Sequence, residues 1–223
     1  MKNIWFKKDP GLFESLKADV AAVYPNLHFY VEKDLVLLRG TFPILHEGKV
    51  LDRYSVEIKL LPDYPESIPI VREIGDRIPR VADYHMNSCG DACLFLPDER
   101  WEAYPPGTNF IDFLKGPLHN FFLSQALVQT GQPWPFGQHG HGANGIRDYY
   151  SKLLATEDPI AILKYLGYLS KPRLKGHWDC PCGSGKRLRN CHLKVLNDLR
   201  IKIPLQIAHN SWDKLSKSML QQL

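Results

Sequence analysis

The sequence predicts an α+β fold, and three features of the chain support this prediction. A helical pattern comes first, extended segments with alternating apolar residues follow it, and helical patterns return after a long irregular segment. Helices that precede and follow a run of strands, without alternating with them, are typical of α+β proteins. Because short turns link the extended segments, we expect an antiparallel meander and not the parallel crossovers of a doubly wound sheet.

The first helix and the strands can be placed from local signals. Asp9 and Pro10 suit the start of a helix, and apolar residues then recur at helical spacing until Pro25, which predicts a helix of about 14 residues. Four extended segments follow, at residues 27–32, 35–42, 54–60 and 68–72. The third is apolar at every second position, which predicts a strand with one buried face.

Regular patterns stop after Arg80 for about 28 residues, and a loop of this length in a compact domain usually has a function. Helical patterns return at residues 110–122, at 146–153 and at 193–201. The last residues of the chain carry no clear pattern.

The composition is that of a globular protein, with 223 residues, 44% of them hydrophobic and 23% charged. No run of about 18 apolar residues is present, so we expect no membrane-spanning helix. The first residues lack the apolar core of a signal peptide, which favours a cytoplasmic protein. Five cysteines in a reducing compartment indicate thiol chemistry or metal binding in place of disulfides.

Charge and cysteines divide the chain into an acidic body and a basic tail. Residues 1–170 hold 17 Lys and Arg against 21 Asp and Glu, whereas residues 171–223 hold 11 against 3. Two cysteines lie in the body and three in the tail. The two groups of thiols are therefore expected to have different roles.

The tail contains a metal-ligand pattern. Cys180 and Cys182 flank a single residue before a Gly-Ser-Gly turn, and Cys191 and His192 follow as a pair. Three thiols and an imidazole are the donors that Zn²⁺ prefers in closed, four-coordinate structural sites. The pattern resembles the zinc-binding SEC-C module, which implies a structural and not a catalytic zinc ion; the alternative is three free cysteines.

Lys and Arg surround these ligands in sequence. Such a surface could dock an acidic protein or nucleic acid, offset the charge of the thiolates, or simply be solvated. Since no aromatic residues are interleaved with the cations, a protein partner is favoured over nucleic acid.

Segments of the body resemble the ubiquitin-conjugating enzyme family. Leu61–Pro69 is similar to the Pro- and Tyr-rich turn after the third strand of that family, and Gly90–Leu94 is similar to the segment around its thioester cysteine. Trp101, eight residues beyond Cys93, matches a Trp of the family. The resemblance covers residues 9–155 and implies a ubiquitin-conjugating-enzyme-like fold: an N-terminal helix, a four-stranded meander, an active-site loop and C-terminal helices.

The resemblance implies a thioester-forming transferase with Cys93 as the nucleophile. The family carries His-Pro-Asn with Asn eight residues before the cysteine, whereas here His85 has that spacing and Asn87 lies closer. Divergent bacterial relatives resemble this chain in placing a His there, so His85 is assigned to stabilise the oxyanion or orient the reacting groups, with Asn87 as the second choice. Cys89 is interpreted as a bystander, or else as a redox partner of Cys93.

Three further carboxylates in the loop could orient or deprotonate an attacking amine, although exposed loop carboxylates usually only bind water: Asp91, Asp98 and Glu99. The His139-Gly140-His141 segment could suggest a metal site, but it resembles a marker of the bacterial relatives and is not assigned as one.

The expected domains are a catalytic domain at residues 1–155, a helical linker at 156–175 and a zinc-binding tail at 176–223. The combination resembles stand-alone conjugating enzymes of bacterial antiphage operons, and for the cyclic-oligonucleotide signalling type it implies a cyclic-nucleotide synthase, or else a ubiquitin-like protein, as the conjugated partner. Two other classes stay open. One is a non-catalytic module that binds a ubiquitin-like or other partner, and the other is a zinc-dependent adaptor that acts through the basic tail.

Overall fold

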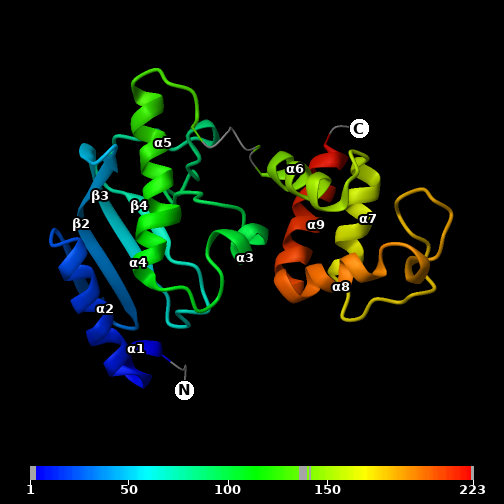
Figure 1. Ribbon diagram of the computed structural model, residues 1–223, viewed down its shortest axis with the longest axis horizontal. Helices are drawn as coiled ribbons and strands as arrows, with labels where there is room; N and C mark the ends of the chain where they lie inside the picture. The colour runs from blue at the N-terminus through cyan, green and yellow to red at the C-terminus, as the bar shows by residue number, and fades with distance from the viewer. Residues whose placement is uncertain (1–3, 136–139, 141, 222–223) are drawn as a thin grey trace. The chain divides into compact units, whose positions relative to one another are not determined.

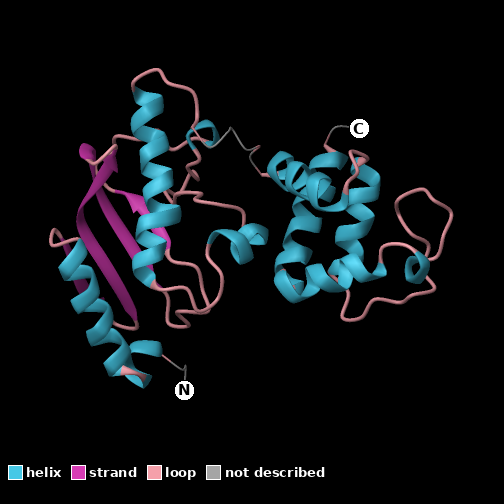
Figure 2. Ribbon diagram, viewed as in Figure 1, coloured by secondary structure: helices cyan, strands magenta, loops and turns pink. Residues whose placement is uncertain are grey.

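The computed structural model describes residues 4–135, 140 and 142–221. Its four-stranded antiparallel sheet has the order β1-β2-β3-β4, with helices before and after it in the chain (Figures 1 and 2). The predicted α+β class and antiparallel meander are confirmed. The chain forms two compact units. We call Met1–Leu94 with Ala103–Gly137 the sheet unit, and Phe95–Glu102 with Gln138–Leu223 the helical unit.

The sheet unit begins with α1 (Trp5–Lys8) and α2 (Pro10–Val23), and α2 coincides with the predicted first helix. The Asp9 carboxylate accepts a hydrogen bond from the backbone N–H of Leu12 over 2.9 Å, which caps the helix as the sequence predicts. The strands follow as β1 (Leu27–Glu32), β2 (Leu35–His46), β3 (Lys49–Leu60) and β4 (Ile70–Glu73).

Strands β2 and β3 extend beyond their predicted limits and meet in a tight hairpin. Glu47 and Gly48 connect them, and both have positive φ, at 50° and 77°. This is the backbone that a two-residue hairpin turn requires. The alternation is hidden here because Pro43 interrupts it in β2 and polar residues open β3.

One face of the sheet carries the core of the sheet unit. Its side chains are fully buried at eight positions of β2 and β3: Val36, Leu38, Phe42, Ile44, Tyr54, Val56, Ile58 and Leu60. Helix α5 (His119–Gln129) packs over the sheet in Figure 1 and places Phe122 with its ring centroid 4.7 Å from that of Tyr54. A short helix α4 (Phe110–Phe113) and a π-helical turn at Leu114–Leu118 precede α5. Pro117 lies in that turn, where its missing N–H is tolerated.

The helical unit consists of α6 (Ala143–Leu154), α7 (Pro159–Leu169), α8 (Leu193–Lys202) and α9 (Leu205–Leu220). The segment Phe95–Glu102 also belongs to it, with the short helix η2 (Pro97–Glu99) and the start of α3 (Arg100–Ala103). Among the described residues, none of the helices combines the length and the apolarity needed to span a bilayer.

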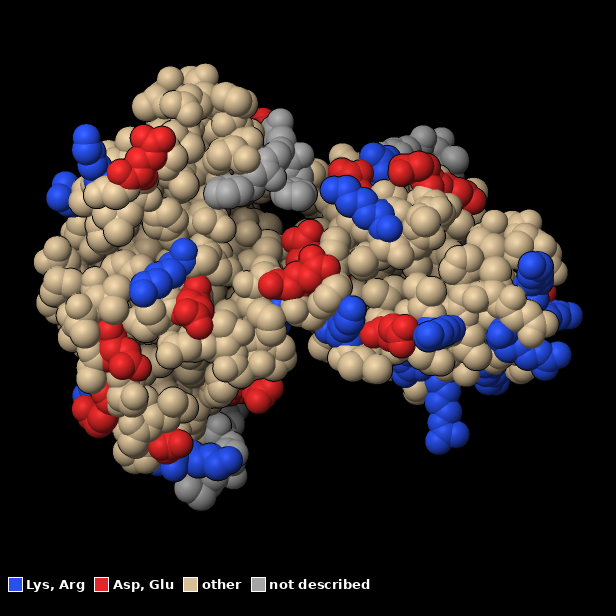
Figure 3. Space-filling view, viewed as in Figure 1, with Lys and Arg blue, Asp and Glu red and all other residues tan. Residues whose placement is uncertain are grey.

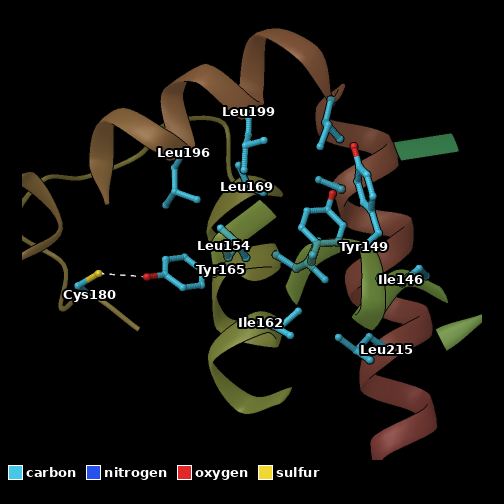
Figure 4. Packing of buried hydrophobic residues seen from close by; sticks show 14 of the residues in the cluster. Ile146, Tyr149, Leu154, Ile162, Tyr165, Leu169, Cys180, Leu196, Leu199 and Leu215 are labelled. Carbon is cyan, nitrogen blue, oxygen red and sulfur yellow. Dashed lines mark hydrogen bonds between the residues drawn. The ribbon is translucent and has the colours of Figure 1, made fainter. Parts of the chain in front are cut away.

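The division into units differs from the predicted boundaries. Helix α6 was expected in the catalytic domain and α7 in a linker, but both pack with α9 (Figure 4). The reason is burial, since Tyr150 of α6 and Tyr165 of α7 are fully buried in the same cluster as Leu196 of α8 and Leu215 of α9. Helix α7, within the expected linker at 156–175, is therefore part of a core.

Candidate functional site

Cys93 lies on the second strand of a short hairpin that follows β4. Its backbone N–H donates to the carbonyl of His85 over 2.8 Å, and Met86 pairs with Ala92 as the next rung. This pairing places Cys93 and His85 opposite each other on neighbouring strands. The backbones of the predicted nucleophile and of the residue preferred to support it are therefore adjacent.

Asn87 closes the turn of this hairpin. Its backbone N–H and its side-chain Nδ2 both donate to the carbonyl of Asp91, over 2.9 Å and 3.1 Å. Its carbonyl accepts from the N–H of Gly90, which has φ +88°. The Asn87 amide thus has a structural partner and lies farther along the hairpin than His85.

Cys89 is exposed at the tip of the same turn. Three residues, Gly90, Asp91 and Ala92, separate it from Cys93, and both cysteines are free thiols. The interpretation of Cys89 as a bystander, or else as a redox partner, stays a prediction.

The hairpin continues the sheet at β4. Ala92 donates its N–H to the carbonyl of Val71 over 2.8 Å, and Asp91 pairs with Arg72 both through the backbone and as an ion pair. Asp91 therefore anchors the loop to the sheet. This contact argues against the possibility that it activates an amine.

His85 is held in an unusual backbone conformation beside an aromatic ring. Its φ is +52°, a left-handed value that histidine tolerates better than most residues. Its imidazole centroid lies 4.8 Å from that of Trp134, edge to face. Cys93 itself is half-buried. A thiol of intermediate exposure with an imidazole on the adjacent strand is an arrangement suited to nucleophilic chemistry.

Asp98 and Glu99, in contrast, are not loop carboxylates facing an amine. Asp98 is 2% exposed inside the helical unit, where it accepts hydrogen bonds from Tyr150 and Ser211. Burial raises the pKa of this carboxyl, and the two hydrogen bonds oppose the rise. Glu99 accepts from the backbone N–H of Leu96 over 3.0 Å and so stabilises the start of η2.

The second site gathers the four tail ligands. The Sγ atoms of Cys180, Cys182 and Cys191 and a ring nitrogen of His192 all lie within 4.8 Å of one another. Nδ1 of His192 is 3.1 Å from Sγ of Cys180 and 3.2 Å from Sγ of Cys191, and the sulfurs of Cys182 and Cys191 are 3.6 Å apart. Tetrahedral coordination with bonds of 2.0–2.3 Å puts donors about 3.3–3.8 Å apart. These residues could therefore hold one metal ion.

Two turns bring the ligands into place. Cys180 donates its N–H to the carbonyl of Lys186 over 2.9 Å, which closes the Gly-Ser-Gly turn, where Gly183 and Gly185 have positive φ. The 3.1 Å hydrogen bond with the Ser184 hydroxyl is the largest of several contacts that, against the effect of burial, lower the pKa of Cys182 to about 6. A low thiol pKa favours the thiolate, which is the form that binds metals.

Cys180 connects this cluster to the core of the helical unit. It is 6% exposed, and its sulfur lies 3.3 Å from the hydroxyl of Tyr165 (Figure 4). Burial, and secondly the hydrogen bond with Cys180, raises the pKa of Tyr165, so its hydroxyl stays protonated. The metal-ligand cluster is thus continuous with the buried residues of α7.

Cations predominate on the exposed surface of this part of the helical unit (Figure 3). Exposed cations near the ligands in sequence include Lys171, Arg173, Lys175, Lys186 and Arg189. Arg187 pairs with Asp179 at 2.7 Å. His139 and His141, considered above for a metal site, lie outside the described residues.

Comparisons with protein families, curated proteins and solved structures find no match for this chain. The geometry and chemistry of the two cysteine sites are therefore the grounds on which its function is inferred.

Proposed function

We propose that the chain is a ubiquitin-conjugating-like transferase, in which Cys93 carries a protein carboxyl terminus as a thioester and passes it to a lysine amine. The observation that carries this proposal is the backbone pairing of Cys93 with His85 in a hairpin anchored to the edge of the sheet. It puts a half-buried cysteine and a histidine on paired segments of one hairpin, and covalent catalysis by a thiol uses these two groups together.

The mechanism consists of two acyl transfers. The Cys93 thiolate attacks a carboxyl terminus activated elsewhere and expels its leaving group, which forms the thioester. A deprotonated lysine amine then attacks the thioester carbonyl, the tetrahedral intermediate expels the Cys93 thiolate, and an amide is formed. An imidazole N–H of His85 would stabilise the oxyanion, and a donor in this role typically contributes about 2.7–4 kcal/mol.

Asn87 is the second choice for this donor. Its Nδ2 already donates to the carbonyl of Asp91, so it would have to leave that bond to reach an oxyanion. His85 is the first choice because its backbone pairs directly with that of Cys93.

For the tail, we propose a structural Zn²⁺ held by Cys180, Cys182, Cys191 and His192. Three thiolates and one imidazole form a closed donor set, which fits the observed spacing of the four ligand atoms. Such an ion would hold the two turns together and take no part in acyl transfer.

The proposed setting is the cytoplasm of a bacterium, in antiphage defence, with a cyclic-nucleotide synthase or a ubiquitin-like protein as the donor of the carboxyl terminus. Its support is the resemblance of the Cys93 segment and of the tail motif to the corresponding families. Nucleic acid is not proposed as a partner.

A peptide thioester tests the transferase directly, because it needs no separate activation. Incubated with a glycine-terminated peptide α-thioester, the protein is expected to gain the acyl mass on Cys93, in a form that dithiothreitol removes and free lysine discharges. Cys93→Ala should abolish the adduct, and the matched variant Cys89→Ala should retain it. His85→Ala should leave acylation intact and slow discharge to lysine by about 100-fold. An adduct that survives Cys93→Ala would reject the enzyme hypothesis.

A second candidate function, an adaptor that acts through the basic tail, is favoured by the exposed cations near the metal ligands. In that case charge-reversal variants of Lys171, Arg173 and Lys175 would abolish activity in cells, while Cys93→Ala would leave it unchanged. Loss of activity in Cys93→Ala, with activity retained in the charge-reversal variants, would support the transferase.

A further inference from the structure

The three thiols of the metal-ligand cluster differ in their exposure to solvent. Cys180 is buried, and its sulfur lies 3.3 Å from the hydroxyl of Tyr165, a fully buried residue of the helical unit (Figure 4). Cys182 and Cys191 are only half-buried. Oxidation of a cysteine requires that the oxidant reach its sulfur. Two of the three thiols are therefore accessible to an oxidant, and the third is shielded by the core.

The two accessible sulfurs are also close to each other. The Sγ atoms of Cys182 and Cys191 are 3.6 Å apart, so they need to approach by about 1.5 Å to reach the length of an S–S bond. Cys182 lies in the Gly-Ser-Gly turn, whereas Cys191 follows the short helix η4 (Leu188–Asn190). Small movements of two side chains on separate turns would thus join them.

The turn next to this pair is open to solvent. The hydroxyl of Ser184, an exposed residue, lies 3.1 Å from the sulfur of Cys182 and 3.6 Å from that of Cys191. Gly183 and Gly185 flank Ser184 and are exposed as well. In the part of the chain that the structure describes, no atom beyond the adjoining residues lies within 4 Å of the position that a Cβ would take at either glycine. A small oxidant can therefore approach both sulfurs from this turn.

We propose that Cys182 and Cys191 form an oxidation site for hydrogen peroxide, in which their conversion to a disulfide removes two of the four metal ligands and releases the metal ion. One thiolate of the pair attacks an oxygen of the peroxide, breaks the O–O bond and becomes a sulfenic acid, with hydroxide as the leaving group. The other thiolate attacks that sulfur, forms the S–S bond and expels a second hydroxide. Each hydroxide takes up a proton to give water, so the sulfurs lose the two electrons that the peroxide gains.

The disulfide leaves Cys180 and His192 as ligands. Two donors do not form the closed, four-coordinate set of a structural zinc site, so the ion is released. A thiol reductant opens a disulfide by exchange, which makes the loss of metal reversible. This inference rests on the zinc ion proposed above and is independent of the transferase. It adds an oxidised, metal-free state of the helical unit, consistent with the redox-sensing role that disulfides usually have in a reducing cytoplasm.

The test treats the zinc-loaded full chain with hydrogen peroxide and follows zinc release with a chromogenic chelator, with chelator alone as the blank. We expect the loss of one equivalent of zinc. After alkylation with N-ethylmaleimide, peptide mass spectrometry should place a disulfide between Cys182 and Cys191 and an alkylated thiol at Cys180. Dithiothreitol with added zinc should restore the bound metal. Cys89→Ala and Cys93→Ala are matched controls and should lose zinc as the wild type does, because neither residue is a ligand.

A variant that keeps four donors tests the role of the disulfide. Cys191→His replaces a thiolate by an imidazole, and two thiolates with two imidazoles also form a structural zinc site. This variant is expected to retain its zinc in peroxide, because Cys182 has lost its partner. Release of zinc from it at the wild-type rate would overturn the proposal. If the variant does not fold, the zinc release and the mapped disulfide of the wild type decide.

Two results in the wild type would also overturn the proposal: a disulfide that includes Cys180, or zinc that stays bound when Cys182 and Cys191 are oxidised. Both would leave the proposed metal site intact. Absence of zinc from the reduced protein would overturn the metal site and this inference together. The peptide-thioester assay is read separately, so failure of the transferase does not affect the result.

Discussion

The two cysteine sites are built in opposite ways. In the Cys93 hairpin, backbone hydrogen bonds hold the loop, and the half-buried Cys93 pairs through its backbone with His85. In the tail, side chains converge, and three thiols and an imidazole lie within 4.8 Å of one another. A thiol left partly accessible on a rigid loop can react, whereas thiols that share one centre are arranged to bind. This contrast supports the proposal of a reactive Cys93 and a metal-binding tail.

The cores of the two units also differ in the side chains that form them. The sheet unit closes around aliphatic and aromatic side chains of β2, β3 and α5, whereas the core of the helical unit includes Cys180. The stability of the helical unit should therefore depend on metal, and that of the sheet unit should not.

Loss of a metal ligand is expected to have the largest effect. Cys180→Ala should abolish binding of one equivalent of zinc and unfold the helical unit, because structural zinc sites contribute about 10–16 kcal/mol in small zinc-binding peptides. Hydrogen exchange read by mass spectrometry should show loss of protection in α6–α9 and retention in β1–β4. Cys89→Ala is the matched control. Equal loss of protection in both units would contradict the comparison.

A cavity in the core of the sheet unit should destabilise that unit and leave the metal content of the protein unchanged. Ile58 is fully buried in β3, so Ile58→Ala should lower the free energy of unfolding of the sheet unit by about 2–5 kcal/mol. The metal content of the Ile58→Ala variant, measured by atomic emission, should stay at the wild-type value. Loss of metal from this variant would show that the two units do not respond separately.

Several features of the two units could be predicted from the local sequence. Asp9 and Pro10 identified the start of α2, the alternation from Tyr54 to Leu60 identified the sheet, and the spacing of the tail cysteines identified the ligand cluster. In each case the residues that determine the feature are close together in the chain.

Helix α9 was missed for a physical reason. Its buried positions include Ala208, Ser211 and Leu215, and two of these three are small residues that are also common at exposed positions. Asp98 was considered an exposed loop carboxylate because its partners, Tyr150 and Ser211, are distant in sequence. Burial of a polar residue by distant partners leaves no local signal.

The hydroxyl of Tyr165 offers a finer test of the link between core and cluster. Tyr165→Phe keeps the ring and removes only the contact with Cys180, which should lower stability by about 1 kcal/mol. Loss of a hydrogen bond to a metal ligand typically weakens binding by about 10–100-fold, so zinc should be lost to a competing chelator at lower chelator concentration. Tyr168→Phe, whose hydroxyl donates to the carbonyl of Asp179, is the matched control. The same zinc affinity in both variants would mean that the contact with Cys180 does not support the metal site.

The pH dependence contributed by Asp98 should be the smallest of these effects, because hydrogen bonds from Tyr150 and Ser211 oppose the rise that burial causes in its pKa. A raised native pKa means that the folded protein holds this proton at pH values where the unfolded chain, with a pKa of about 3.9, has released it. Stability from this group is therefore greatest below the unfolded pKa, decreases as pH rises through the native pKa, and then levels off. Asp98→Asn cannot titrate, so the wild-type unfolding free energy minus that of the variant should fall with rising pH in urea titrations of the helical unit. A difference that is flat or that increases with pH would show that the hydrogen bonds outweigh burial, and that Asp98 is ionised throughout and holds Phe95–Glu102 as a full carboxylate.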